Sequence, residues 1–111
     1  MEVRSLAETQ SVEALDGVHL AQVASGDRAS LQHFRIDPGA TVAPHDHENE
    51  QIGWLAGGSL AFDVEGEAMV VEAGDAYVIP GGETHGVENR DDAAAVGVEA
   101  FVPARESPPW E

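Results

Sequence analysis

Short alternating runs of apolar and polar residues, each closed by turn residues, dominate this sequence. They fall at residues 18–24, 29–36, 52–56, 59–65, 68–73, 75–80, 84–89 and 93–102. Glycine, aspartate or proline bounds these runs, and such period-two segments are typical of β-strands. So many short strands at regular spacing indicate a sandwich or a barrel. We therefore expect an all-β fold, with Leu60, Phe62 and Val64 pointing into its core.

The chain has 111 residues, enough for one domain with one core. We expect an N-terminal arm over residues 1–17, a barrel over 18–102 and a tail over 103–111. Val12–Leu15 suggests a helical turn, and the prolines of ESPPWE favour an extended or terminal strand. The sequence shows neither a signal peptide nor the roughly 20 apolar residues that span a bilayer. It also lacks cysteine, so we expect a cytoplasmic protein without disulfides.

Acidic side chains outnumber basic ones heavily. The chain has 21 aspartates and glutamates against five basic residues, all arginine, and a formal net charge of -16. Such a charge excludes nucleic-acid binding, which needs a cationic surface. One interpretation is simply a solvated acidic surface. We favour a halophilic source, because at 1 M salt a Debye length of about 3 Å screens the self-repulsion.

The stretch PHDHENEQ, residues 44–51, places His45 and His47 one residue apart. On a strand, residues i and i+2 face the same way with Cα atoms about 6.6 Å apart, so both imidazoles would face one metal ion. Two exposed polar side chains on a strand edge are the alternative. His19 and His33 have no partner at ligand spacing, and we expect them to be surface or hydrogen-bonded strand residues.

Two longer motifs enclose this pair. Residues 39–58 follow G-x5-H-x-H-x3-Q-x6-G, and residues 74–89 follow G-x5-P-x-G-x2-H-x3-N. The chain here resembles the cupin superfamily, whose first motif carries glutamate where Gln51 stands. The resemblance implies a double-stranded β-helix (jelly-roll) barrel around one divalent metal, often in a homodimer. Residues 80–82 should form the tight turn that lifts His85 to the metal.

Carried over position by position, the resemblance implies that His45, His47, Gln51 and His85 bind the metal. Imidazole ligands suit Mn, Fe, Ni, Zn or Cu, and the sequence does not choose among them. A register slip would make Glu50 the ligand, but strand parity points Glu50 away and favours a solvated side chain. Because all four ligands are neutral, a dication keeps its full charge and prefers a carboxylate or enolate ligand.

The segment VEAFVPAR, residues 98–105, places Glu99 and Phe101 on one strand face, with Arg105 after a proline turn. Two interpretations stay open from this spacing alone. The three side chains form a site for a small anionic molecule beside the metal. Alternatively, Phe101 lies in the core, Glu99 is solvated and Arg105 forms a surface ion pair.

HDHENEQIGWLAGG and EAFVPARE resemble the small cupins of pectin and alginate breakdown, which convert unsaturated monouronates into linear keto forms. The resemblance implies that Glu99, Phe101 and Arg105 take part in the reaction. Three positions depart from that pattern: Glu99 replaces aspartate, Trp54 replaces tyrosine and Ala104 replaces proline. The longer carboxylate moves the proton donor by about a methylene, which puts activity in question more than binding.

We hypothesise a metal-dependent enzyme that opens and ketonises unsaturated monouronates by Lewis-acid and acid/base catalysis. Arg105 would hold the substrate carboxylate, and Glu99 would move the proton. A metal-dependent dioxygenase is the alternative, and it needs neither residue. A sugar isomerase or epimerase, or a non-catalytic small-ligand-binding module without turnover, are further alternatives. As partners we expect a small anionic substrate and a second copy of the chain, but no nucleic acid and no membrane.

Overall fold

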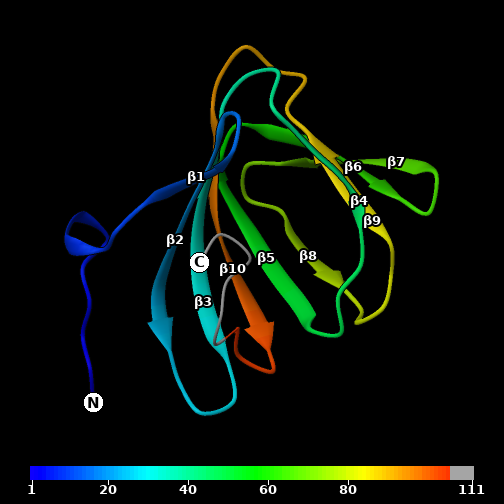
Figure 1. Cartoon of the computed structure of the whole chain (residues 1–111). Helices are drawn as coiled ribbons and strands as arrows, with labels where there is room; N and C mark the ends of the chain where they lie inside the picture. Colours follow the sequence, from blue (N-terminus) through cyan, green and yellow to red (C-terminus); the bar gives the residue numbers. More distant parts are fainter. Residues whose placement is uncertain (106–111) are drawn as a thin grey trace.

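The computed structural model describes residues 1–105, which form two antiparallel sheets facing each other (Figure 1). The larger sheet has the order β1-β2-β3-β10-β5-β8. Its strands are Val12–Leu15, Val18–Ser25, Ser30–Ile36, Ala95–Val102, Glu50–Gly57 and Ala76–Ile79, in that order. The smaller sheet has the order β4-β9-β6-β7, from Thr41–His45, His85–Glu88, Ser59–Val64 and Glu67–Glu72. The all-β expectation is confirmed, and the strand order is that of a jelly-roll barrel.

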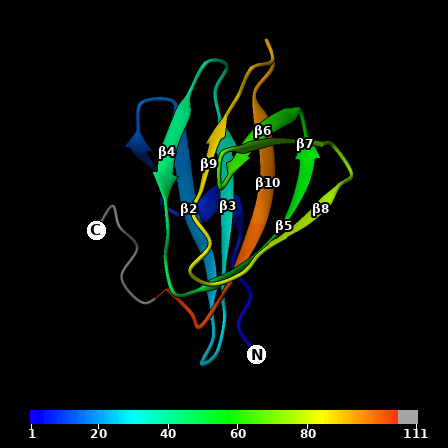
Figure 2. The same cartoon turned by 90° about the vertical axis from the view of Figure 1, so that its right-hand side faces the viewer.

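The core lies between the two sheets, which overlap when the smaller sheet faces the viewer (Figure 2). Its buried side chains are Phe34, Ile36, Leu55, Leu60, Phe62, Ile79 and Ala95. Leu60 and Phe62 are buried and Asp63 is exposed, as the alternation in that run predicts. Ala61 is buried as well. Strand β6 lies between β7 and β9, and these neighbouring strands cover so small a side chain.

The expectation of a helical turn at Val12–Leu15 is wrong. This segment is strand β1, which pairs antiparallel with β2 and matches Val12 to Leu20. Asp16 and Gly17 form the two-residue connection, and Gly17 has a φ of 75°, which glycine adopts without strain. An Asp-Gly pair between two short strands is a hairpin signal, and it carries more information than the helical pattern of four residues.

Within residues 1–105, the 3-10 turn η1 (Leu6–Glu8) is the only helical element, and no helix is long and apolar enough to cross a membrane. The final part of the expected tail, ESPPWE, lies outside the described residues.

Candidate metal centre and the adjoining cavity

Three histidines converge at one end of the smaller sheet. His45 ends β4 and His85 begins β9, and the antiparallel pairing of these strands sets the two residues opposite each other. Their ring centroids are 4.6 Å apart, and the His47 ring lies 5.1 Å from that of His85. One potential ligand atom from each histidine lies within 4.8 Å of the others, so the three form a candidate metal centre.

His47 reaches this centre by a different route from the one expected. Strand β4 ends at His45, so His47 lies in the following loop rather than two residues along the same strand. The Gly82 N–H donates to the His47 carbonyl oxygen at 2.8 Å. A Cβ at Gly81 would overlap the carbonyl oxygen of Glu48. The glycine turn of the second motif therefore packs directly on the loop of the first, which joins the two halves of the centre.

Backbone carbonyls fix the protonation of all three imidazoles. The Nδ1 atoms of His45, His47 and His85 lie 3.0, 3.0 and 2.9 Å from the carbonyl oxygens of Ala43, Asn49 and Glu83. A carbonyl oxygen only accepts, so each Nδ1 carries a proton, and in the neutral imidazole Nε2 then keeps a free lone pair. Burial also lowers the pKa of His47 and His85, which favours the neutral form that binds metals.

Gln51 completes the donor set from β5. Its side chain is buried, and its Oε1 lies 3.0 Å from His47 Nε2. With the His47 proton on Nδ1, two acceptor atoms face each other, an arrangement that suits a cation between them. Gln51 also lines the same cavity as Glu99 and acts to lower the pKa of that carboxyl group. Glu50 is exposed on the opposite face, as strand parity predicts.

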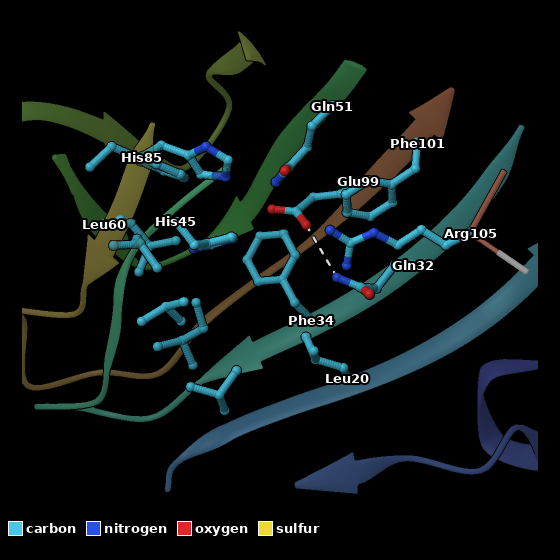
Figure 3. A pocket seen from close by; sticks show the side chains of 16 residues that line it. Leu20, Gln32, Phe34, His45, Gln51, Leu60, His85, Glu99, Phe101 and Arg105 are labelled. Carbon is cyan, nitrogen blue, oxygen red and sulfur yellow. Dashed lines mark hydrogen bonds between the residues drawn. The ribbon is translucent and has the colours of Figure 1, made fainter. Parts of the chain in front are cut away.

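A cavity of about 110 Å³ opens beside the metal centre (Figure 3). His45, Gln51 and His85 form one wall of it. Apolar side chains, among them Leu20, Phe34 and Leu60, line much of the rest. Gln32, Glu99, Phe101 and Arg105 line it as well.

Glu99, Phe101 and Arg105 all line this cavity. Glu99 and Phe101 lie on the inner face of β10, as their spacing predicts. The Arg105 Cζ atom lies 4.0 Å from the centroid of the Phe101 ring, and the ring of His47 is 5.9 Å from the same ring. Arg105 makes no ion pair with any residue from 1 to 105, so the expected alternative of a surface ion pair is not seen.

The carboxylate of Glu99 has further partners that sequence analysis missed. Tyr77 Oη donates to Glu99 Oε1 at 2.6 Å, and Gln32 Nε2 donates to Oε2 at 3.2 Å. Burial raises the pKa of Glu99, although these donors, Gln51 and Arg105 act in the opposite direction. Alternation alone places Gln32 inward on its strand, but no sequence signal pairs it or Tyr77 with Glu99.

Other residues singled out in the sequence lie away from the centre. Trp54 is 48% exposed on the outer face of the larger sheet. His19 hydrogen-bonds to Asp37, with 2.9 Å between Nε2 and Oδ2, and lines a shallow outer pocket together with His33. Both histidines are thus strand residues away from the metal centre, as expected.

Asn89, the last residue of the second motif, has a structural role. Its side chain is buried, and Nδ2 donates to the carbonyl oxygens of Ile36 and Ala93, each at 2.9 Å. Asn89 Oδ1 accepts from the backbone N–H of Asp91. The side chain therefore fastens the loop after β9 to the end of β3.

Comparison with known proteins places these features in context. The cupin domain family matches residues 32–101. The pectin degradation protein KdgF of Dickeya dadantii is 30% identical over 99 residues, which cover 88% of this chain and 89% of that protein. The oxalate-binding protein of Thermotoga maritima is 32% identical over 72 residues, which cover 63% of this chain and 60% of that protein. The solved structure of KdgF from Halomonas sp. superposes with a TM-score of 0.87 at 26% identity and covers 96% of both chains.

Proposed function

The chain belongs to the cupin family, and from this premise we propose that it is a metal-dependent enzyme that opens and ketonises unsaturated monouronates. The observation that carries the proposal is a group of three histidines, two of which line a single cavity together with a guanidinium and a partly buried carboxylate. The similarity to a pectin degradation protein over most of both chains supports an unsaturated uronate as the substrate class.

His45, His47, Gln51 and His85 would hold one divalent transition metal ion. The free Nε2 lone pairs and the amide oxygen fit such an ion, and imidazole nitrogen suits Mn, Fe, Ni, Zn or Cu. When bound, the ion supplies a Lewis acid for an anionic oxygen, and four neutral ligands leave its charge undiminished.

Arg105 and Phe101 bind and orient the substrate in this proposal. The guanidinium over the Phe101 ring offers a planar pair of donors that matches a uronate carboxylate. The Phe101 ring and the apolar residues below it, among them Leu20 and Phe34, exclude water from the reacting end of the sugar. The long-range repulsion between an acidic protein and an acidic sugar is screened at molar salt, which leaves Arg105 and the metal centre to determine binding.

Glu99 moves the proton. In the isomerisation the C1–O5 bond of the cyclic hemiacetal breaks, and the anomeric hydroxyl group loses its proton as the aldehyde forms. The C4 atom gains a proton as the enol becomes a ketone, so one carboxylate can accept the first proton and return the second. No oxidant or other co-reactant is needed. The raised pKa of Glu99 favours both halves of this exchange near neutral pH.

A non-catalytic module that binds small carboxylates is the second candidate. It is favoured by the similarity to an oxalate-binding protein, and it requires the metal centre and Arg105 but not Glu99. A metal-dependent dioxygenase needs neither Glu99 nor Arg105, and it would consume oxygen.

The test is an anaerobic assay in molar salt with protein loaded separately with Mn, Fe, Ni or Zn. Unsaturated galacturonate is added, and loss of the enol-acid ultraviolet absorbance is followed. We expect decay well above the spontaneous rate that is lost in His85→Ala and Arg105→Ala. Binding without turnover would favour the binding module. Turnover that appears only when the assay is repeated in air, with oxygen uptake, would favour the dioxygenase.

We also propose a homodimer, formed through the outer face of the larger sheet. Ile52, Trp54, Val78 and Val102 are 43, 48, 60 and 41% exposed on this face. Ile52 and Val78 are cross-strand partners, so the patch is continuous across two strands. Exposed apolar patches of this kind mark interaction surfaces. A cytoplasmic location remains a prediction from the sequence, and so does a halophilic source, which the net charge of -16 suggests.

A further inference from the structure

We propose that Tyr77 and Gln32 are positioning residues that hold the Glu99 carboxylate in place at the wall of the cavity. The inference rests on the proposed function, because it assigns Glu99 the moving proton. Gln32 lies outside both motifs and Tyr77 occupies an unspecified position of the second, and both donate hydrogen bonds to the same carboxylate.

The strand order places these residues in one row across the larger sheet. Glu99 of β10 is the cross-strand partner of Gln32 on β3 and of Gly53 on β5. Gly53 is in turn the partner of Tyr77 on β8. The carboxylate therefore has a donor on each side, one strand away at Gln32 and two strands away at Tyr77.

Gly53 makes the longer of these two contacts possible. A Cβ at this position would overlap the Tyr77 ring, so the ring lies across Gly53 where any other residue would place its side chain. The far side of the ring packs against Phe62 of the opposite sheet, with 4.9 Å between the ring centroids. The ring is thus held between two strands and has its hydroxyl group directed at Glu99.

The hydrogen bonds hold the Glu99 carboxylate in place and leave some of its accepting positions free. Tyr77 donates to Oε1 and Gln32 donates to Oε2. A carboxylate has about four lone-pair sites, so accepting capacity remains for a substrate hydroxyl group. In Figure 3 the carboxylate lies between Gln51 and Gln32, close to the guanidinium of Arg105. Donors from two strands, one on each side, leave this side chain little freedom to leave the cavity wall.

Fixing the carboxylate matters because proton transfer depends steeply on distance, and a displacement of about 1 Å can cost on the order of 100-fold in rate. Tyr77→Phe removes the hydroxyl group and keeps the ring packing. We expect kcat to fall about 10- to 100-fold while KM stays within about twofold, because substrate binding depends on Arg105 and the metal centre. Gln32→Met should cost less, about three- to tenfold in kcat, since its hydrogen bond is longer.

A double-mutant cycle separates this role from simple structural support. In the Glu99→Gln background, Tyr77→Phe should change the residual kcat by less than about twofold, because both variants disable the same proton transfer. Gln22→Met is the matched control for Gln32→Met, since Gln22 lies in register beside Gln32, one strand farther from Glu99. Gln22→Met should leave kcat and KM unchanged, and all variants should keep the wild-type metal content.

The outcomes distinguish this inference from the proposed function. If the wild-type protein shows no turnover of unsaturated galacturonate, the proposed function fails and the inference fails with it. If the wild-type protein turns over but Tyr77→Phe and Gln32→Met keep kcat within twofold, only the inference is overturned. If Tyr77→Phe lowered kcat by the same factor in the wild-type and Glu99→Gln backgrounds, the inference would also be overturned.

Discussion

At the scale of single residues, Gln51 serves two neighbours at once. Its Oε1 faces His47 Nε2 at 3.0 Å, and its side chain acts to lower the pKa of Glu99. Glutamate at this position would cancel one unit of charge on a bound dication and set two carboxylates against each other. The charge argument is available from the sequence, whereas the contact with Glu99 emerges only from the pairing of β5 with β10.

Gln51→Glu should therefore separate metal binding from substrate binding. We expect the affinity for the metal to be kept or raised, and KM for unsaturated galacturonate to rise about tenfold, as one unit of attraction for the anion is lost. Calorimetric metal titration and steady-state kinetics measure the two effects. Glu50→Gln, on the exposed face of the same strand, is the control and should change neither. An unchanged KM in Gln51→Glu would refute the charge argument.

Glu99→Gln should cost activity without costing stability. Because burial raises the pKa of Glu99, the folded protein holds this proton to a higher pH than the unfolded chain does. The stability from that proton is present below the unfolded pKa and is lost as pH rises through the folded one. At pH 8, metal-free Glu99→Gln should unfold at or above the wild-type temperature, and this advantage should disappear in acid. Its kcat should fall by at least about 100-fold.

Thermal unfolding of chelator-treated protein at several pH values tests this expectation. A variant less stable than the wild-type protein at pH 8 would show that the folded state favours the ionised carboxylate. The direction of the pKa shift would then be wrong.

At the scale of elements, the turn at residues 80–83 and the loop after β4 form one unit. The carbonyl oxygen of Glu48 occupies the space that a side chain at Gly81 would need, and Gly82 donates to His47. The metal centre therefore depends on backbone packing between two loops as well as on the identity of its ligands.

Gly81→Ala should push these loops apart and weaken metal binding by about 10- to 100-fold, the range seen when outer contacts of ligands are lost. Gly26→Ala is the control, because a Cβ there meets nothing closer than 3.5 Å. Metal titration of both variants measures the effect. Wild-type affinity in Gly81→Ala would mean that the two loops hold their ligands independently.

Much of the strand arrangement could be predicted from the sequence, because the alternation of apolar and polar residues is a local signal that shows which residues face inward. The strands on either side of the cavity and the inward side chains Glu99 and Phe101 were predicted in this way. Strand β1 was missed because four residues fit a helical turn equally well. The shared strand expected for His45 and His47 was wrong, since β4 ends at His45. Tyr77 joins Glu99 only through the order β10-β5-β8, which no local pattern encodes.

At the scale of the whole molecule, an apolar outer sheet face contrasts with a strongly acidic composition. The exposed Trp54 lies within that face, and the net charge is -16. Association through the apolar face would bury it, while the like charges oppose association at low salt.

Trp54→Glu should convert the proposed dimer into a monomer in molar salt, because it places a charge at the centre of an apolar interface. Trp54→Tyr keeps an aromatic ring and should remain dimeric. Light scattering after size exclusion measures the mass. A monomeric wild-type protein, or a dimeric Trp54→Glu variant, would exclude this face as the interface.

Stability should rise with salt. Between 0.1 and 2 M KCl the Debye length falls from about 10 Å to below about 3 Å, so repulsion among the acidic groups is screened. The unfolding temperature should rise over this range by more than in sucrose of matched osmolality. A flat or falling profile would remove the halophilic interpretation and leave an ordinary acidic surface.

The central claim is that this cavity converts an unsaturated uronate by proton transfer alone. Proton NMR in deuterated buffer follows this reaction directly in anaerobic, metal-loaded protein. The account predicts that the olefinic C4 signal disappears at a rate proportional to enzyme concentration. The linear keto product should gain one deuteron at C4, and Glu99→Gln should slow the reaction by at least about 100-fold. An olefinic signal that decays no faster than in buffer with the same metal would contradict the account.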